Sequence, residues 1–66
     1  MKLDETEQQL LLLLADENTL EEMAAKLGLS ERKVNKIFQN MLQKFEVKSE
    51  VGLIKEAITK GLIDNE

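Results

Sequence analysis

The chain has 66 residues, with 9 lysines and arginines, 13 aspartates and glutamates, and no cysteine, histidine or proline. A folded chain of this length buries only about 60% of the surface that its unfolded form exposes, which leaves little interior for a deep substrate cleft. Without cysteine or histidine, a disulfide framework, a zinc finger and a Ser-His-Asp or Cys-His nucleophile are excluded.

The first predicted helix covers residues 5–15. Asp4 and Glu7 stand three positions apart, as in a capping box, where each side chain accepts a free backbone N–H of the other. Five consecutive leucines then run all round the helix. We expect the core stripe to consist of Leu10, Leu13 and Leu14. Leu11 or Leu12 is expected to lie outside it, either packing within the domain or contacting another chain.

Three further helices are predicted, over residues 20–27, 31–46 and 50–60. Each follows a hydroxyl residue that can cap a helix N-terminus, and these are Thr19, Ser30 and Ser49. Gly28 and Gly61 are placed to end the second and the fourth helix, because glycine tolerates the left-handed C-cap conformation. No segment alternates as a strand does. The sequence predicts one all-α domain over residues 1–66.

The spacing across the second and third helices matches a helix-turn-helix. In that motif a small residue lets two helices approach, a glycine four residues later makes the turn, and two later apolar residues anchor the second helix. Residues at these spacings are Ala24, Gly28, Val34 and Ile37. The apolar positions between them hold Met23, Leu27 and Leu29. The alternative is that the same geometry packs a domain that binds no nucleic acid.

Four blocks along the chain carry a family pattern. The blocks are the opening helix up to Leu13-Leu14-Ala15, the segment 22–30 (EMAAKLGLS), the residues Val34, Met41 and 44–47 (KFEV), and the closing Ala57, Gly61 and Leu62. From about Leu3 to Ile63 the chain resembles the LuxR/GerE type of DNA-binding domain found in bacterial response and quorum-sensing regulators. The resemblance implies a four-helix fold whose third helix enters the DNA major groove. It also implies dimerisation through the last helix, where Leu53 and Ala57 would form the contact.

The departures from the pattern fall where that family contacts DNA. Asn35 stands where the family usually has lysine or arginine, Ile37 where it commonly has histidine, and Glu50 where it usually has arginine. A glutamate close to a phosphate is repelled. Lys33, where the family prefers threonine, compensates in part.

The outward arc of the third helix could read base pairs. The candidates are Arg32, Asn35 or Lys36, and Gln39. Arginine pairs with guanine and asparagine or glutamine with adenine, each good pair discriminating by about 1–3 kcal/mol. The candidate phosphate contacts are Lys33, Lys44 and Lys48. The alternative for each is an ordinary solvated side chain.

Charge is divided along the chain. Residues 1–31 hold eight acids and two bases, whereas residues 32–60 hold seven bases and three acids. DNA binding predicts that the basic part faces the duplex and the acidic part faces away. The competing hypothesis is a protein-interaction or dimerisation module, anti-activator-like, that has lost DNA binding and binds a regulator through spare apolar residues. Those residues would be Leu11, Leu12 and Leu53.

The remaining classes are disfavoured. The acids are expected on exposed helix arcs and caps, so we expect no catalytic site, no metal and no cofactor. The longest apolar run, 10–15, is far shorter than the ~20 residues that cross a bilayer, and no signal segment opens the chain. We therefore expect a cytoplasmic protein.

Overall fold

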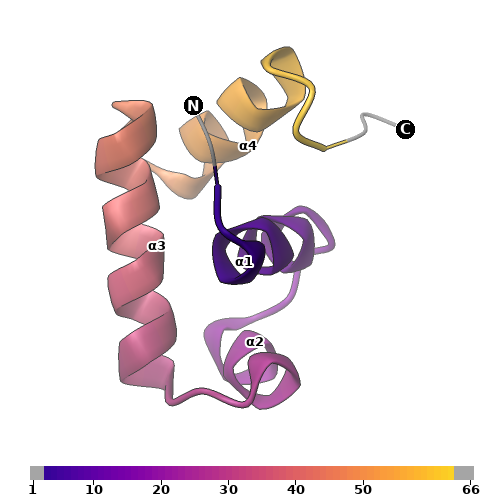
Figure 1. Ribbon diagram of the computed structural model, residues 1–66, viewed down its shortest axis with the longest axis vertical. Coiled ribbons are helices and arrows are strands. Elements are labelled where there is room, and N and C mark those ends of the chain that lie inside the picture. The colour runs from indigo at the N-terminus through magenta and orange to yellow at the C-terminus, as the bar shows by residue number, and fades with distance from the viewer. Residues whose placement is uncertain (1–2, 64–66) are drawn as a thin grey trace.

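The computed structural model describes residues 3–63 and contains the four predicted helices. They are α1 (Glu5–Ala15), α2 (Leu20–Leu27), α3 (Glu31–Phe45) and α4 (Glu50–Thr59). No strand occurs between residues 3 and 63. α1 lies between α2 and α4, and α3 runs along the side of all three (Figure 1). The all-α helix-turn-helix prediction is therefore confirmed.

The predicted N-caps form at all four helices. Oxygens of Asp4, Thr19, Ser30 and Ser49 each accept the backbone N–H three residues on, at 2.7–3.3 Å. The side chains of Glu7 and Glu22 in turn accept the backbone N–H groups of Asp4 and Thr19, which completes both capping boxes. Each cap fixes where a helix begins, because it satisfies donors that lack partners inside the helix.

Two C-termini differ from the prediction by one residue. α3 ends at Phe45, because Glu46 takes the left-handed conformation (φ 59°) and the Val47 N–H turns back to the Leu42 carbonyl at 3.0 Å. α4 ends at Thr59, with Gly61 left-handed after it. A glutamate in the left-handed region is uncommon, so the sequence carried no signal for the first of these stops.

The buried face of α1 is turned relative to the prediction. Leu10 and Leu14 are buried as expected, but Leu11 has no exposed surface, whereas Leu13 is only half-buried. Leu12 remains 49% exposed. The reason is that α1 contacts three helices at once, so its buried arc is wide. Leu11 is thus a core residue and is not available to a partner.

Candidate nucleic-acid interface

The turn between α2 and α3 has the geometry that its glycine predicts. Gly28 has φ 70°, and the Leu29 N–H donates to the Ala24 carbonyl at 3.0 Å. A Cβ added at Gly28 would meet nothing within 4 Å, so the position requires glycine for its backbone conformation and not for space. The turn sets the angle at which α3 leaves α2.

α3 is anchored by one apolar face. Ala24 of α2 is buried, Val34 of α3 has no exposed surface, and Ile37 is partly buried against the same core. The small side chain of Ala24 allows α2 and α3, which are in contact, to approach closely. With this face buried, the opposite face of α3 must point to solvent.

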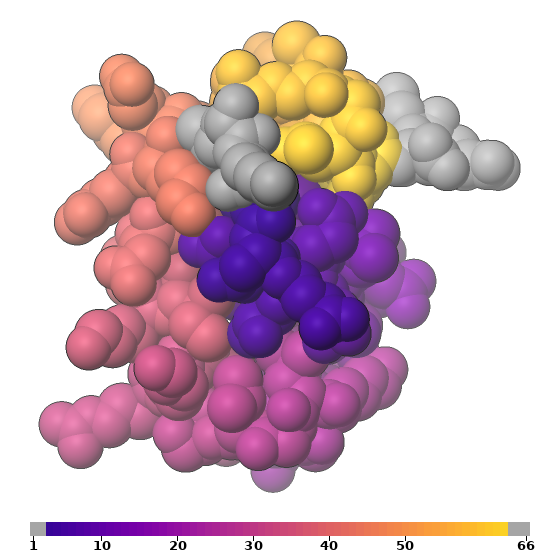
Figure 2. Space-filling view, viewed as in Figure 1, coloured from indigo at the N-terminus to yellow at the C-terminus, as the bar shows by residue number. Residues whose placement is uncertain are grey.

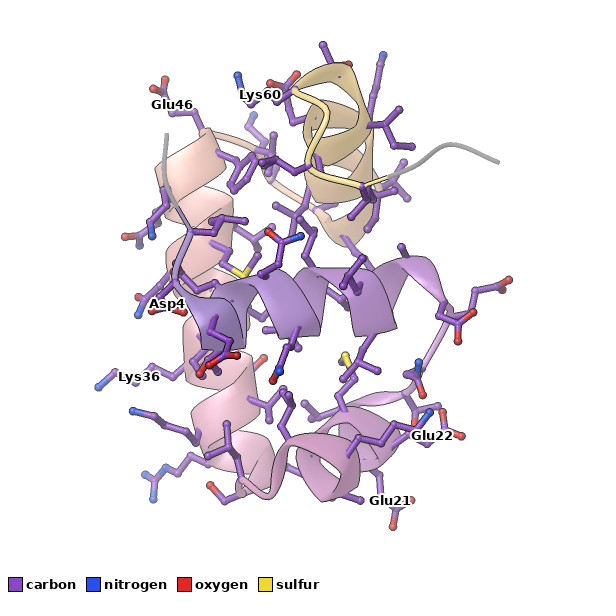
Figure 3. The ribbon with its side chains drawn as sticks, turned by 45° about the vertical axis from the view of Figure 1, so that its right-hand side comes forward. Asp4, Glu21, Glu22, Lys36, Glu46 and Lys60 are labelled. Carbon is purple, nitrogen blue, oxygen red and sulfur yellow. The ribbon has the colours of Figure 1, made fainter. Side chains whose placement is uncertain are left out.

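The exposed face of α3 carries the residues singled out for base reading. Every one of them is exposed, namely Arg32, Asn35, Lys36 and Gln39. Arg32, Lys36 and Gln39 follow one another at four and three residues, so they lie on one arc of the helix. Lys36 extends away from the other helices (Figure 3). Side chains of α3 stand clear of the body along one edge of the molecule (Figure 2).

A groove follows the first turns of this face. Its volume is about 510 Å³, and it is lined by Ser30, Arg32, Lys33, Asn35 and Lys36. Three of the five lining residues are cations, and Ser30 marks the helix N-terminus, which carries partial positive charge. The groove is therefore a positively charged concave surface.

The three lysines predicted to contact phosphate are placed differently from one another. Lys33 and Lys48 are exposed. The ammonium of Lys44 lies 2.9 Å from each carboxylate oxygen of Glu7, a residue of α1 that is only 8% exposed. Lys44 therefore differs from the other two in having its charge already paired inside the protein.

Two of the residues that depart from the family pattern line the same cavity. Asn35 and Glu50, both exposed, line a cavity of about 220 Å³ whose other walls come from the end of α1, the α1–α2 connection, α2 and α3. Glu50 is the first residue of α4. Glu50 thus lines a cavity to which α3 also contributes Asn35.

The predicted dimer contact at Leu53 and Ala57 is wrong in this structure. Both side chains have no exposed surface and belong to the core of the single chain, so a second copy cannot reach them. The same burial removes Leu53 from the apolar residues expected to bind a regulator. Val51, on another side of α4, is 77% exposed.

An apolar groove that the sequence did not reveal lies between the end of α1 and α4. It has a volume of about 420 Å³ and is lined by Leu14, Ala15, Glu17, Glu50, Val51, Ile54, Lys55 and Ile58. The exposure of Val51 together with the partial burial of Ile54 and Ile58 marks it in the structure. Sequence periodicity alone could not reveal this groove, because α4 has apolar residues on more than one side.

Three acidic side chains, those of Asp4, Glu7 and Glu22, take part in capping boxes. Hydrogen bonds from the Thr19 backbone N–H, and next from its hydroxyl, lower the pKa of the Glu22 carboxyl below its ordinary value. Within residues 3–63 no cluster of three or more acidic, histidine or cysteine side chains is arranged to hold a metal ion. Nor is any helix in that range long and apolar enough to cross a membrane.

Comparison with known proteins gives one match. A family model described as bacterial regulatory proteins, luxR family, matches residues 1–57. Searches among curated proteins and among solved structures returned no match. The match includes the whole helix-turn-helix and most of α4.

Proposed function

The chain belongs to the luxR family of bacterial regulatory proteins, and we propose on that basis that it is a sequence-specific DNA-binding regulator of transcription. The observation that carries the proposal is the exposed arc of α3, where Arg32, Lys36 and Gln39 project from a helix anchored by its opposite face. Such a regulator acts in the cytoplasm and needs neither a cofactor nor a catalytic group.

We assign some of these side chains to base contacts and others to phosphate contacts. Arg32 and Gln39 have the donors and acceptors that pair with guanine and adenine edges, and Asn35 offers the same chemistry from the flank. Lys33 and Lys48, both exposed, would hold phosphates and set the register. Lys36, at the centre of the arc, reaches either a base or a phosphate.

A charge reversal at Lys36 tests the proposal. On a random-sequence duplex at about 50 mM salt, Lys36→Glu is expected to weaken binding by more than tenfold, since each lost phosphate contact reduces the salt slope by about 0.9. Lys60→Glu is the matched control, because Lys60 is equally cationic but lies at the end of α4, away from Lys36 (Figure 3). Equal losses for both variants would contradict a contact at α3.

Gln39→Ala distinguishes base recognition from phosphate contact. After a preferred site has been selected, this variant should lose about 1–3 kcal/mol on that site and little on a random duplex. Lys36→Glu should weaken binding on both. A uniform loss for Gln39→Ala would mean that Gln39 does not read a base.

We propose further that the protein binds DNA as a homodimer through the groove beside α4. Val51 supplies an exposed apolar centre, and Lys55 lies in the same groove as Glu17, so two copies related by a two-fold axis can pair opposite charges. A symmetric dimer would present two copies of α3 to half-sites about one helical turn apart.

The dimer is tested by sedimentation equilibrium. Val51→Glu should shift the protein to monomer, whereas Leu12→Glu, which alters an exposed leucine outside the groove, should not. If Val51→Glu leaves the mass of the native protein unchanged, the groove is not the dimer contact.

The competing function is a protein-interaction module that binds a regulator in place of DNA. Glu50, which lines the same cavity as Asn35, and the net charge of -4 favour it. The two functions differ in salt dependence: a duplex titration that gives no binding at low salt would favour the interaction module, with the α4 groove as its docking surface.

A further inference from the structure

Glu7 and Lys44 form the most tightly held ion pair among residues 3–63. The Lys44 Nζ lies 2.9 Å from both Oε1 and Oε2 of Glu7, compared with 3.6 Å for the Lys60–Glu56 pair. Oε1 of Glu7 also accepts the Asp4 N–H at 3.1 Å. The Glu7 side chain is 10% exposed and that of Lys44 37% exposed. The Glu7 carboxylate therefore accepts hydrogen bonds from both the Asp4 backbone and the Lys44 ammonium.

The pair lies on the flank of α3 that also carries Lys33, a candidate phosphate contact. Lys33, Asn40 and Lys44 follow at seven and four residues, so they share one side of the helix. Lys33 and Lys44 are eleven residues apart, or about 16 Å along the axis. If α3 enters a major groove, this flank faces one DNA strand along much of its length.

We propose that Glu7 is a positioning residue that limits DNA affinity by holding Lys44 in an internal pair. Lys44 then contributes by neutralising the Glu7 carboxylate near the DNA and not by contacting phosphate itself. This inference rests on the proposed DNA binding. It assigns a role in binding to a residue of α1, a helix that carries none of the proposed DNA contacts.

The direct test is the salt slope of Glu7→Gln on a random-sequence duplex. Glutamine keeps the oxygen that accepts the Asp4 N–H, so the helix cap is preserved. Lys44 is released, and one additional phosphate contact should steepen the slope by about 0.9, which tightens binding about 15-fold at about 50 mM salt and about 4-fold at about 200 mM. The matched control is Glu5→Gln, which makes the same charge change at an exposed position of the same helix.

Lys44→Met, alone and combined with Glu7→Gln, gives an independent test. The single variant should bind more weakly, because it leaves the Glu7 carboxylate uncompensated. The double variant should regain the affinity and the slope of the native protein. If Lys44 itself held a phosphate, the double variant would stay weak, with a slope lower by about 0.9.

The outcomes separate this inference from the proposed function. Native protein that binds DNA, with a steeper slope for Glu7→Gln than for Glu5→Gln, supports the inference. Binding with equal slopes for these two variants overturns the inference alone. Absence of binding by the native protein overturns the proposed function and the inference with it. Circular dichroism spectra matching the native protein establish that each variant is folded.

Discussion

Replacing Glu50 is expected to strengthen DNA binding. Glu50 is exposed, opens α4 and shares a cavity with Asn35 on α3. Two unit charges about 4 Å apart in water interact by ~1 kcal/mol. Removing the repulsion in Glu50→Gln should therefore tighten binding about fivefold. Reversing it in Glu50→Lys should tighten binding about 30-fold at low salt and steepen the salt slope by about 0.9.

The same change weakens the fold slightly. Glu50 lies in the first turn of α4, where a negative charge is stabilising by about 0.3–1 kcal/mol. For a domain of this size the Tm of Glu50→Lys should fall by about 1–8 °C. If Glu50→Lys binds DNA more tightly although its Tm is lower, the tighter binding cannot result from a more stable fold and must arise at the DNA interface.

Fluorescence anisotropy with a labelled duplex at two salt concentrations measures the effect. The matched control is Glu21→Lys, which makes the same charge change in the first turn of α2. Glu21 lies on the far side of the molecule from Lys36 (Figure 3). If Glu50→Lys and Glu21→Lys tighten binding equally, net charge accounts for the gain. If neither does, Glu50 is not near the DNA and the docking of α3 is refuted.

Three predictions concern the fold. In urea unfolding, Leu11→Ala should lose about 2–5 kcal/mol because Leu11 is fully buried, and Leu12→Ala less than about 0.5 kcal/mol; equal losses would contradict the buried face of α1. Gly28→Ala should lose about 1–2 kcal/mol, since φ is 70°, and an unchanged Tm would argue against the left-handed turn. The pKa of Glu22 is lowered in the folded chain, so its stabilisation is present above the unfolded pKa and lost as pH falls through the folded value. Urea midpoints of Glu22→Gln should therefore depend less on pH across the acidic range than those of the native protein, and identical pH profiles would oppose this.

The helix starts and the α2–α3 turn could be predicted because they depend on local chemistry. Thr19 and Ser30 accept N–H groups only three residues away, and Gly28 supplies its own backbone conformation. Such signals lie within a few residues of the feature that they determine. The exposed arc of α3 follows from the strong amphipathic pattern of that helix.

Tertiary features could not be predicted in the same way. The pair between Glu7 and Lys44 joins residues 37 positions apart, and no local pattern indicates it. Apolar residues occur on more than one side of α4, and which side is buried depends on the packing of α4 against α1 and α3, so Leu53 was expected at the surface but is buried. Glu46 takes a left-handed conformation that glutamate seldom adopts.

The measurement that tests the central claim most directly is a titration of the native protein into a random-sequence duplex at about 50 and 200 mM salt. If the exposed cations of α3 outweigh the net charge of -4, binding in the micromolar range should weaken steeply with salt, with about 0.9 of slope for each phosphate contacted. No binding at the lower salt, at protein concentrations that populate a dimer, would contradict DNA binding and would leave a helix-turn-helix that acts through protein contacts.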